Sequence, residues 1–216
     1  MARKTAEEAE RTRQSILASG AQIFASRGFS GATLEVIAKQ AGLSRGAVYW
    51  HFKGKEELLL VVLQETTLPV EHFFSAGMDL QQNIQRLHTA IKQTFTHTES
   101  RQLCEVLLKK NESIVDANPI AERLHLAQRR FVSQMQHLLE SAIYKGEINP
   151  ALDIDLTCRI FQTYLSGLFF ECLQGNLNIS NHIESTFIVI ADVLFRSPAH
   201  SLTARANLLG LRPQTP

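Results

Sequence analysis

The amino-acid sequence predicts an all-α protein. Apolar residues recur at helical spacing along nearly the whole chain, and alternating strand patterns and Asn-Gly hairpin turns are missing. The 216 residues suffice for a small domain followed by a larger one, and 44% hydrophobic with 20% charged residues is typical of a folded chain. We therefore expect an N-terminal three-helix domain, residues 1–55, and a C-terminal helical domain, residues 56–216.

The N-terminal part should contain one longer helix and two short ones. The first is expected over residues 8–26, where apolar side chains recur every three to four positions. Thr33 can cap a second helix that ends near Gly42, and Ser44 can cap a third. The joining segment AGLS, with the small Ala38 four residues before its glycine, is typical of a helix-turn-helix.

The third helix lies within "SRGAVYWHF", residues 44–52, and carries polar and aromatic side chains that a buried helix would not need. If Val48 faces the core, Gly46 and Trp50 lie on the opposite face. Such a helix suits the major groove of DNA, where side chains bond to base edges and phosphates and a glycine allows close approach. The residues that we expect to contact DNA on these grounds are Arg45, Gly46, Tyr49, Trp50 and His51.

The charge distribution supports a polyanionic partner for the N-terminal part only. The whole chain has a formal net charge of +1, but residues 1–55 hold nine Lys and Arg against four Glu. This segment is therefore +5 and the remainder −4.

Several classes of protein are not indicated. The longest aliphatic run, residues 58–63, is too short to span a membrane, and no secretory segment opens the chain, so we expect a cytoplasmic protein without membrane contact. The three cysteines show no CxxC spacing and predict buried free thiols. No HExxH, GxSxG or phosphate-loop motif occurs, so we expect no metal, no cofactor and no enzymatic activity.

The segment "TLEVIAKQAGLSRGAVYWHFKGKEELL" resembles the DNA-binding signature of the TetR family of bacterial transcriptional regulators. Together with "MARKTAEEAERTRQSILASGAQIFASRGF" it most resembles the AcrR-like branch, which represses multidrug efflux pumps. Farther along, "CEVLLKKNES" and "YLSGLFFECL" are similar to segments of that branch. The resemblance implies a homodimeric repressor that binds a palindromic operator and is released by a small apolar or amphipathic inducer.

The family's DNA contacts transfer to matching positions of this chain. The resemblance places the following residues against DNA: Thr33, Ser44, Arg45, Gly46, Tyr49, Trp50, His51 and Lys55. Lys55 also fits on physical grounds, because the positive end of a helix already favours a phosphate. Gly54 departs from the Asp, Asn or Ser that the family often has before this lysine, although glycine still caps acceptably.

Turn signals divide the second domain into six helices. They are expected at about 55–75, 80–97, 100–114, 119–145, 153–173 and 180–195. The last two are apolar on more than one face, which predicts that one face packs within the domain and another against a partner. The resemblance implies a four-helix dimer interface, for which the candidates are Leu165, Ser166, Gly167, Phe187, Ile190 and Leu194.

The ligand pocket is the least determined site. Aromatic and polar residues of the second domain make up the candidate lining: Leu63, Phe95, Asn111, Glu112, Gln162, Phe169 and Glu171. Two alternatives stay open at this stage. One is a protein of the same fold that organises DNA or blocks other machinery without an inducer, and the other is a helical-bundle enzyme with a basic head.

Overall fold

The computed structural model describes residues 6–108, 119–174 and 179–195. Within these ranges the regular structure is helical, which confirms the predicted fold class. The elements are α1 (Ala6–Arg27), α2 (Leu34–Gln40), α3 (Arg45–His51), α4 (Lys55–Glu65), the 3-10 helix η1 (Pro69–Glu71), α5 (Leu80–Thr96), α6 (Thr98–Leu108), α7 (Pro119–Tyr144), α8 (Ile154–Gln174) and α9 (Ile179–Phe195).

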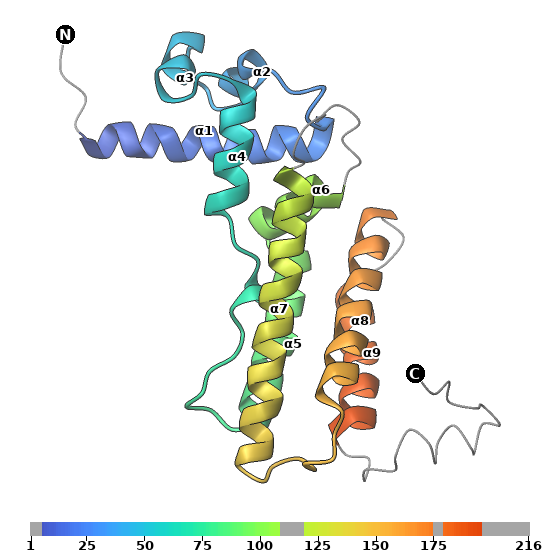
Figure 1. Ribbon diagram of the computed structural model, residues 1–216. Helices are drawn as coiled ribbons and strands as arrows, with labels where there is room; N and C mark the ends of the chain where they lie inside the picture. Colours follow the sequence, from blue (N-terminus) through green and yellow to red (C-terminus); the bar gives the residue numbers. More distant parts are fainter. Residues whose placement is uncertain (1–5, 109–118, 175–178, 196–216) are drawn as a thin grey trace.

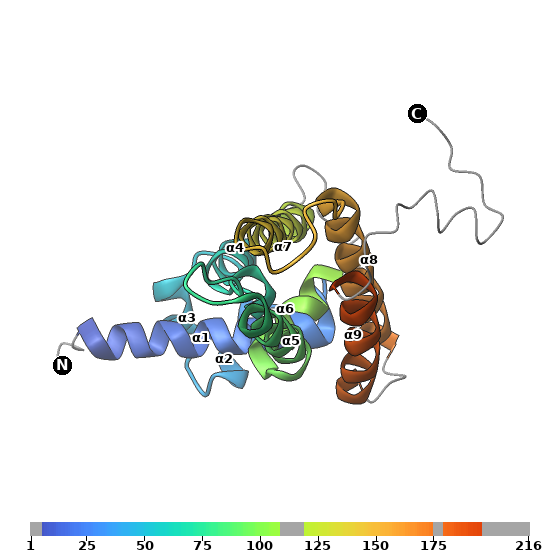
Figure 2. The same cartoon turned by 90° about the horizontal axis from the view of Figure 1, so that it is seen from below.

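The molecule has a head and an elongated body (Figure 1). In the head, α1 lies across the top of the body and packs against α2, α4 and α6. In the body, α5 and α7 run along its length, and α8 and α9 form a pair on one side, which Figure 2 shows from below. None of the helices in the described ranges combines the length and apolar composition needed to cross a bilayer.

Local signals explain the head. The Thr33 hydroxyl caps α2 by accepting from the Val36 N–H at 3.2 Å, and the Ser44 hydroxyl caps α3 by accepting from the Ala47 N–H at 3.2 Å. Gly42 adopts a φ of 66° in the turn between them, a left-handed conformation that glycine tolerates best. The predicted helix-turn-helix is therefore present.

The expectation of a single helix over 55–75 is wrong, because α4 ends at Glu65. Pro69 disfavours helical geometry at the residue before it. The terminal carbonyls also find a partner on another helix. Arg123 of α7 donates from Nε to the Leu63 carbonyl at 2.8 Å and from Nη2 to the Thr66 carbonyl at 2.9 Å.

The same arginine is paired with a carboxylate from η1. Arg123 Nη2 lies 2.5 Å from Glu71 Oε1, and the side chains are 6% and 0% exposed. Arg130 Nη1 donates to the other Glu71 oxygen at 2.9 Å, and the Leu68 N–H donates to Oε1 at 2.9 Å. These bonds tie the end of α4 and the segment after it to α7.

Helices α5, α7, α8 and α9 fall close to their predicted bounds, and α6 begins near its predicted start, whereas its predicted end at 114 lies outside the described residues. Cys104 and Cys158 are buried, as expected, and Cys104 Sγ donates to the Thr94 carbonyl at 3.8 Å. Burial first and nearby acidic groups second raise the pKa of Cys158 to about 11. The side chain of Cys172 lies outside the described residues.

Candidate nucleic-acid interface and ligand sites

Helix α3 exposes the aromatic side chains Tyr49 and Trp50 to solvent. Val48 is fully buried, whereas Trp50 is 74% exposed and Tyr49 46% exposed. A Cβ added to Gly46 would meet nothing within 4 Å, so another surface could approach the backbone closely there. The His51 ring packs edge-on against Trp50, with 4.6 Å between the ring centroids. An exposed helix of this composition has the form of a DNA-reading element.

Arg45, at the first position of α3, is held by two neighbours. Its Nη1 lies 2.5 Å from Glu35 Oε1 of α2, and its guanidinium carbon is 5.3 Å from the centroid of the Tyr49 ring. The Tyr49 side chain and then Glu35 raise the pKa of Arg45. The guanidinium therefore stays charged, and the Arg45 side chain is 62% exposed.

Lys55 lies at the N-terminus of α4, as expected, but its ammonium group already has partners. Nζ donates to the Phe29 carbonyl at 3.0 Å and sits 4.4 Å from the centroid of the Phe29 ring. Since an ammonium group has three donors, two remain for a phosphate. Phe29 thus orients the lysine and ties the loop after α1 to α4.

Two residues at this surface were missed by sequence reasoning, namely Glu35 and Phe29. Glu35 could have been found from its position two residues after the Thr33 cap, which puts it on the same exposed side as the start of α3. For Phe29, no signal in the sequence singles out its carbonyl as the partner of a lysine 26 residues later.

The body contains a partly enclosed cavity of about 90 Å³ between η1, α7 and α8. Its walls are mainly apolar, with two amides and one hydroxyl as polar groups. They consist of Leu68, Val70, Leu124, Ala127, Gln128, Phe131, Gln162, Leu165, Ser166 and Phe169. Of these residues, the sequence predicts Gln162 and Phe169 for the pocket and Leu165 and Ser166 for the dimer interface. It does not single out the other lining residues, because periodicity alone cannot separate a cavity wall from an ordinary core.

The predicted ligand residues are distributed over several places. Gln162 and Phe169 line the enclosed cavity, and Phe95 packs behind Phe169, with ring centroids 5.0 Å apart. Leu63 lies instead between α4 and α7, and Glu171 lies in a groove between α8 and α9. The structure does not bring these two to the cavity. Asn111 and Glu112 lie outside the described residues.

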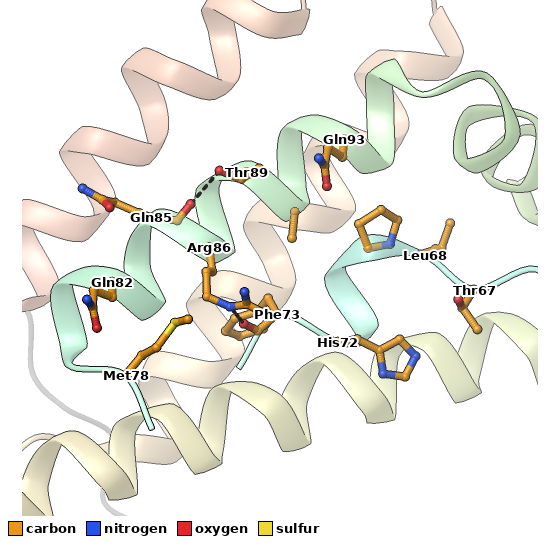
Figure 3. Close-up of a pocket in the computed structure, with 12 residues that line it drawn as sticks. Thr67, Leu68, His72, Phe73, Met78, Gln82, Gln85, Arg86, Thr89 and Gln93 are labelled. Atoms are coloured by element: carbon orange, nitrogen blue, oxygen red, sulfur yellow. Dashed lines mark hydrogen bonds between the residues drawn. The ribbon is translucent and has the colours of Figure 1, made fainter. Parts of the chain in front are cut away.

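A larger hollow, about 780 Å³, runs along α5 beside the segment after α4 (Figure 3). Its wall carries three glutamines and Thr89 of α5, and Arg86 Nε donates to the Phe73 carbonyl at 2.7 Å. This hollow is open to solvent, so an apolar compound would lose little contact with water there. The smaller enclosed cavity is the better candidate for an apolar ligand.

The predicted dimer residues occupy two different environments. Leu165 and Phe187 belong to the core of the protomer, and the Phe187 ring lies 5.1 Å from that of His88 on α5. Ser166 and Gly167 are exposed, and the side chains of Ile190 and Leu194 lie outside the described residues. The exposed apolar side chains on the outer face of α8 and α9 are Phe170, Ile188 and Val189, at 59%, 61% and 62% exposure.

Comparisons with known proteins agree with the helical head. Residues 16–62 match the model of the bacterial regulatory proteins of the tetR family. The HTH-type transcriptional regulator SrpR of Pseudomonas putida is 35% identical over 175 residues, which cover 81% of this chain and 81% of SrpR. The HTH-type transcriptional regulator AcrR of Shigella flexneri is 33% identical over 178 residues, covering 78% of this chain and 81% of AcrR.

Solved structures show the same fold. The SmeT–triclosan complex superposes with a TM-score of 0.70 at 21% identity, over 86% of this chain and 92% of that one. SmeT is the repressor of the Stenotrophomonas maltophilia multidrug efflux pump SmeDEF. With an exposed reading helix, a matching family signature and relatives that cover most of its length, this chain belongs to the TetR family of bacterial transcriptional regulators, in its AcrR-like branch, and is a DNA-binding repressor and not an enzyme.

Proposed function

We propose that this protein represses a multidrug efflux operon in the bacterial cytoplasm and leaves its operator when a small apolar or amphipathic compound binds. The observation that carries the DNA part is the exposure of α3, on which Trp50 is 74% exposed and the Arg45 side chain 62% exposed. The efflux assignment is supported by the known roles named for similar proteins, among them SmeT, the repressor of a multidrug efflux pump, and by similarity to the probable acrEF/envCD operon repressor of Escherichia coli, 27% identical over 184 residues.

In this proposal α3 enters the major groove, and the N-cap residues of α2 and α3, Thr33 and Ser44, contact phosphates. The hydroxyls of Thr33 and Ser44 each accept one backbone N–H and can still donate to a phosphate oxygen. Arg45 reads a base and Lys55 binds the backbone. The full set of proposed contacts is Thr33, Ser44, Arg45, Gly46, Tyr49, Trp50, His51 and Lys55.

A homodimer would supply two such helices to a palindromic operator, with half-sites about 34–36 Å apart. We place its interface on the outer face of α8 and α9, where three large apolar side chains are mostly exposed. Gly167 lies on the same face, and a Cβ there would meet nothing within 4 Å, so a partner helix could cross closely. The domain division at residue 55 is part of the same proposal.

The inducer would occupy the cavity between η1, α7 and α8. Its apolar walls fit an aromatic compound, and Gln128 and Gln162 can orient a polar group. At about 90 Å³ the cavity is smaller than most drug sites, so the ligand must push the surrounding elements apart. The cavity includes Leu68 and Val70 from the segment that follows α4.

This arrangement would couple ligand to DNA. Pressure on Leu68 or on α7 reaches α4 through Arg123, which bonds to carbonyls at the end of that helix. A shift of α4 moves Lys55 and changes the separation of the two α3 helices in the dimer. Ligand-bound and operator-bound states would then compete.

The test begins with in vitro selection of an operator from random duplexes, which should yield a palindrome. Triclosan is then titrated by calorimetry into the free protein and into the protein–operator complex. By linkage, the operator should weaken triclosan binding by the same factor by which triclosan weakens operator binding. Equal triclosan affinity in the two titrations would overturn the inducer mechanism and favour a DNA-organising protein of the same fold.

A further inference from the structure

The C-terminal half of α4 passes the first turns of α7 where the head meets the body (Figures 1 and 2). A further hollow lies between these two helices. It has a volume of about 420 Å³ and is separate from the cavity assigned to the inducer. This α4–α7 groove is lined by Leu60, Leu63 and Gln64 of α4 and by Pro119, Glu122, Arg123, Leu126, Arg129 and Arg130 of α7. These positions repeat every three to four residues, so each helix contributes one face.

Positive charge predominates along this groove. Arg123 and Arg130 share the single carboxylate of Glu71. Arg129 is exposed, and within the described part of the chain no carboxylate lies within ion-pair distance of it. Glu122 also lines the groove but is exposed and pairs with none of these arginines. The three guanidinium groups are thus incompletely neutralised.

Arg123 also has unused hydrogen-bonding capacity. Its Nε and Nη2 bond to the Leu63 and Thr66 carbonyls and to Glu71. Its Nη1 is buried and has no hydrogen-bond partner among the described residues. The side chain as a whole is only 6% exposed, so little water can reach it. A buried charged donor without a partner is costly, and a bound anion would relieve that cost.

The floor of the groove is apolar. Leu60 is 42% exposed although its neighbours Leu59 and Leu63 are buried at 2% each. Leu126 faces it from α7. An occupant could therefore cover exposed leucine while its charged end meets the arginines. The enclosed cavity differs in this respect, because no charged side chain lines it.

We propose that the α4–α7 groove binds an amphipathic organic anion. Its carboxylate or sulfonate accepts hydrogen bonds from Arg129 and from the unpartnered Nη1 of Arg123, and its apolar part packs against Leu60 and Leu126. The occupant touches α4 directly, so it acts on the helix that carries Lys55. That last step rests on the proposed function, whereas the binding site itself does not.

Calorimetry with octanoate tests the binding site on the full chain. Octanoate should bind saturably, whereas 1-octanol, which lacks the charge, and acetate, which lacks the chain, should bind at least about tenfold more weakly. Arg129→Gln should weaken octanoate binding about tenfold. The matched control is Arg159→Gln, the same change at an exposed arginine of α8 outside the groove, which should leave binding unchanged.

The outcomes separate this proposal from the inducer cavity. Failure of octanoate to bind, or equal affinity of wild type and Arg129→Gln, would overturn the anion site. Triclosan binding should be the same in wild type and Arg129→Gln, because Arg129 does not line the enclosed cavity. Loss of triclosan binding in this variant would also overturn the separation of the two sites. If octanoate binds but does not change the anisotropy of a labelled operator in complex with the protein, the proposed effect on α4 is refuted and the binding site stands.

Discussion

Removing the charge of Glu71 should destabilise the protein far more than removing the charge of Glu65. Both carboxylates lie 2.5 Å from an arginine nitrogen, but the Glu71–Arg123 side chains are 0% and 6% exposed and the Glu65–Arg13 side chains 43% and 28%. Glu71→Gln removes the negative charge and retains one oxygen that can accept from the Leu68 N–H, while its NH2 takes the place of the oxygen that accepts from Arg130. Arg123 is then left buried without a counter-charge.

The magnitudes follow from burial. Breaking a buried ion pair by removing one partner costs about 3–5 kcal/mol, because a desolvated charge stays uncompensated. An exposed pair such as Arg13–Glu65 contributes about 0–1 kcal/mol, because water solvates both groups after the change. With a urea m-value of about 2 kcal/mol/M, Glu71→Gln should lower the urea midpoint by about 1.5–2.5 M. Glu65→Gln should lower it by less than about 0.5 M.

Urea unfolding followed by circular dichroism, at one protein concentration for all variants, measures these shifts. Equal midpoints for Glu71→Gln and Glu65→Gln would refute the reasoning, since the two pairs differ mainly in burial. A change in m-value would instead mean that the unfolding reaction itself differs. The two variants carry the same chemical change, so each controls for the other.

The same pair determines a pH dependence. Burial acts to raise the pKa of Glu71, but the bonds from Arg123, Leu68 and Arg130 outweigh it, and the pKa lies below its ordinary value. The contribution of the carboxylate to stability is therefore complete above the unfolded-state pKa of about 4.3 and is lost as the pH falls through the lower folded-state value. The stability gap between wild type and Glu71→Gln should be constant from about pH 7 to 5.5 and narrow below about pH 4.

Three further changes test the DNA and dimer surfaces. Arg45→Ala should lower affinity for a selected operator by roughly tenfold to a hundredfold per half-site in an anisotropy titration, and equal affinity would exclude a base contact. Lys55→Ala should weaken specific and random DNA alike and reduce the salt slope by about one per half-site, so an unchanged slope contradicts a phosphate role. Ile188→Glu should give a folded monomer in sedimentation, whereas Phe187→Glu should unfold the protomer; a dimeric Ile188→Glu would move the interface elsewhere.

The head could be predicted from the sequence because its structure depends on local signals. Thr33 and Ser44 cap helices within three residues, and Gly42 permits its turn without help from distant parts. The orientation of α3 follows from Val48 alone once the helix is known. Neither Glu35 as the partner of Arg45 nor Phe29 as that of Lys55 could be foreseen, since those contacts require helices to be placed in space.

In the body, the sequence predicted where the helices lie along the chain but not which face of each helix packs inside the protomer. Helices α8 and α9 are apolar on more than one side, so periodicity could not tell that Phe187 packs inside the protomer while Ile188 faces outward. Pro69 locally disfavours a helix that continues to residue 75, but the end at Glu65 could not be located, because the partner of the terminal carbonyls is Arg123, about 60 residues later. Glu71 looks like any surface carboxylate until η1 is docked against α7.

The early end of α4 changes how a ligand signal can travel. At 1.5 Å per residue, the 11 residues of α4 span about 16 Å, so the helix ends before the enclosed cavity. The segment from Thr66 to Leu68 is not helical and would be a weak connection alone. Arg123 bonds to carbonyls on both sides of the helix end and to Glu71, so the segment moves with α7. In the proposed mechanism, coupling between the cavity and DNA would therefore depend on this buried pair more than on the length of α4.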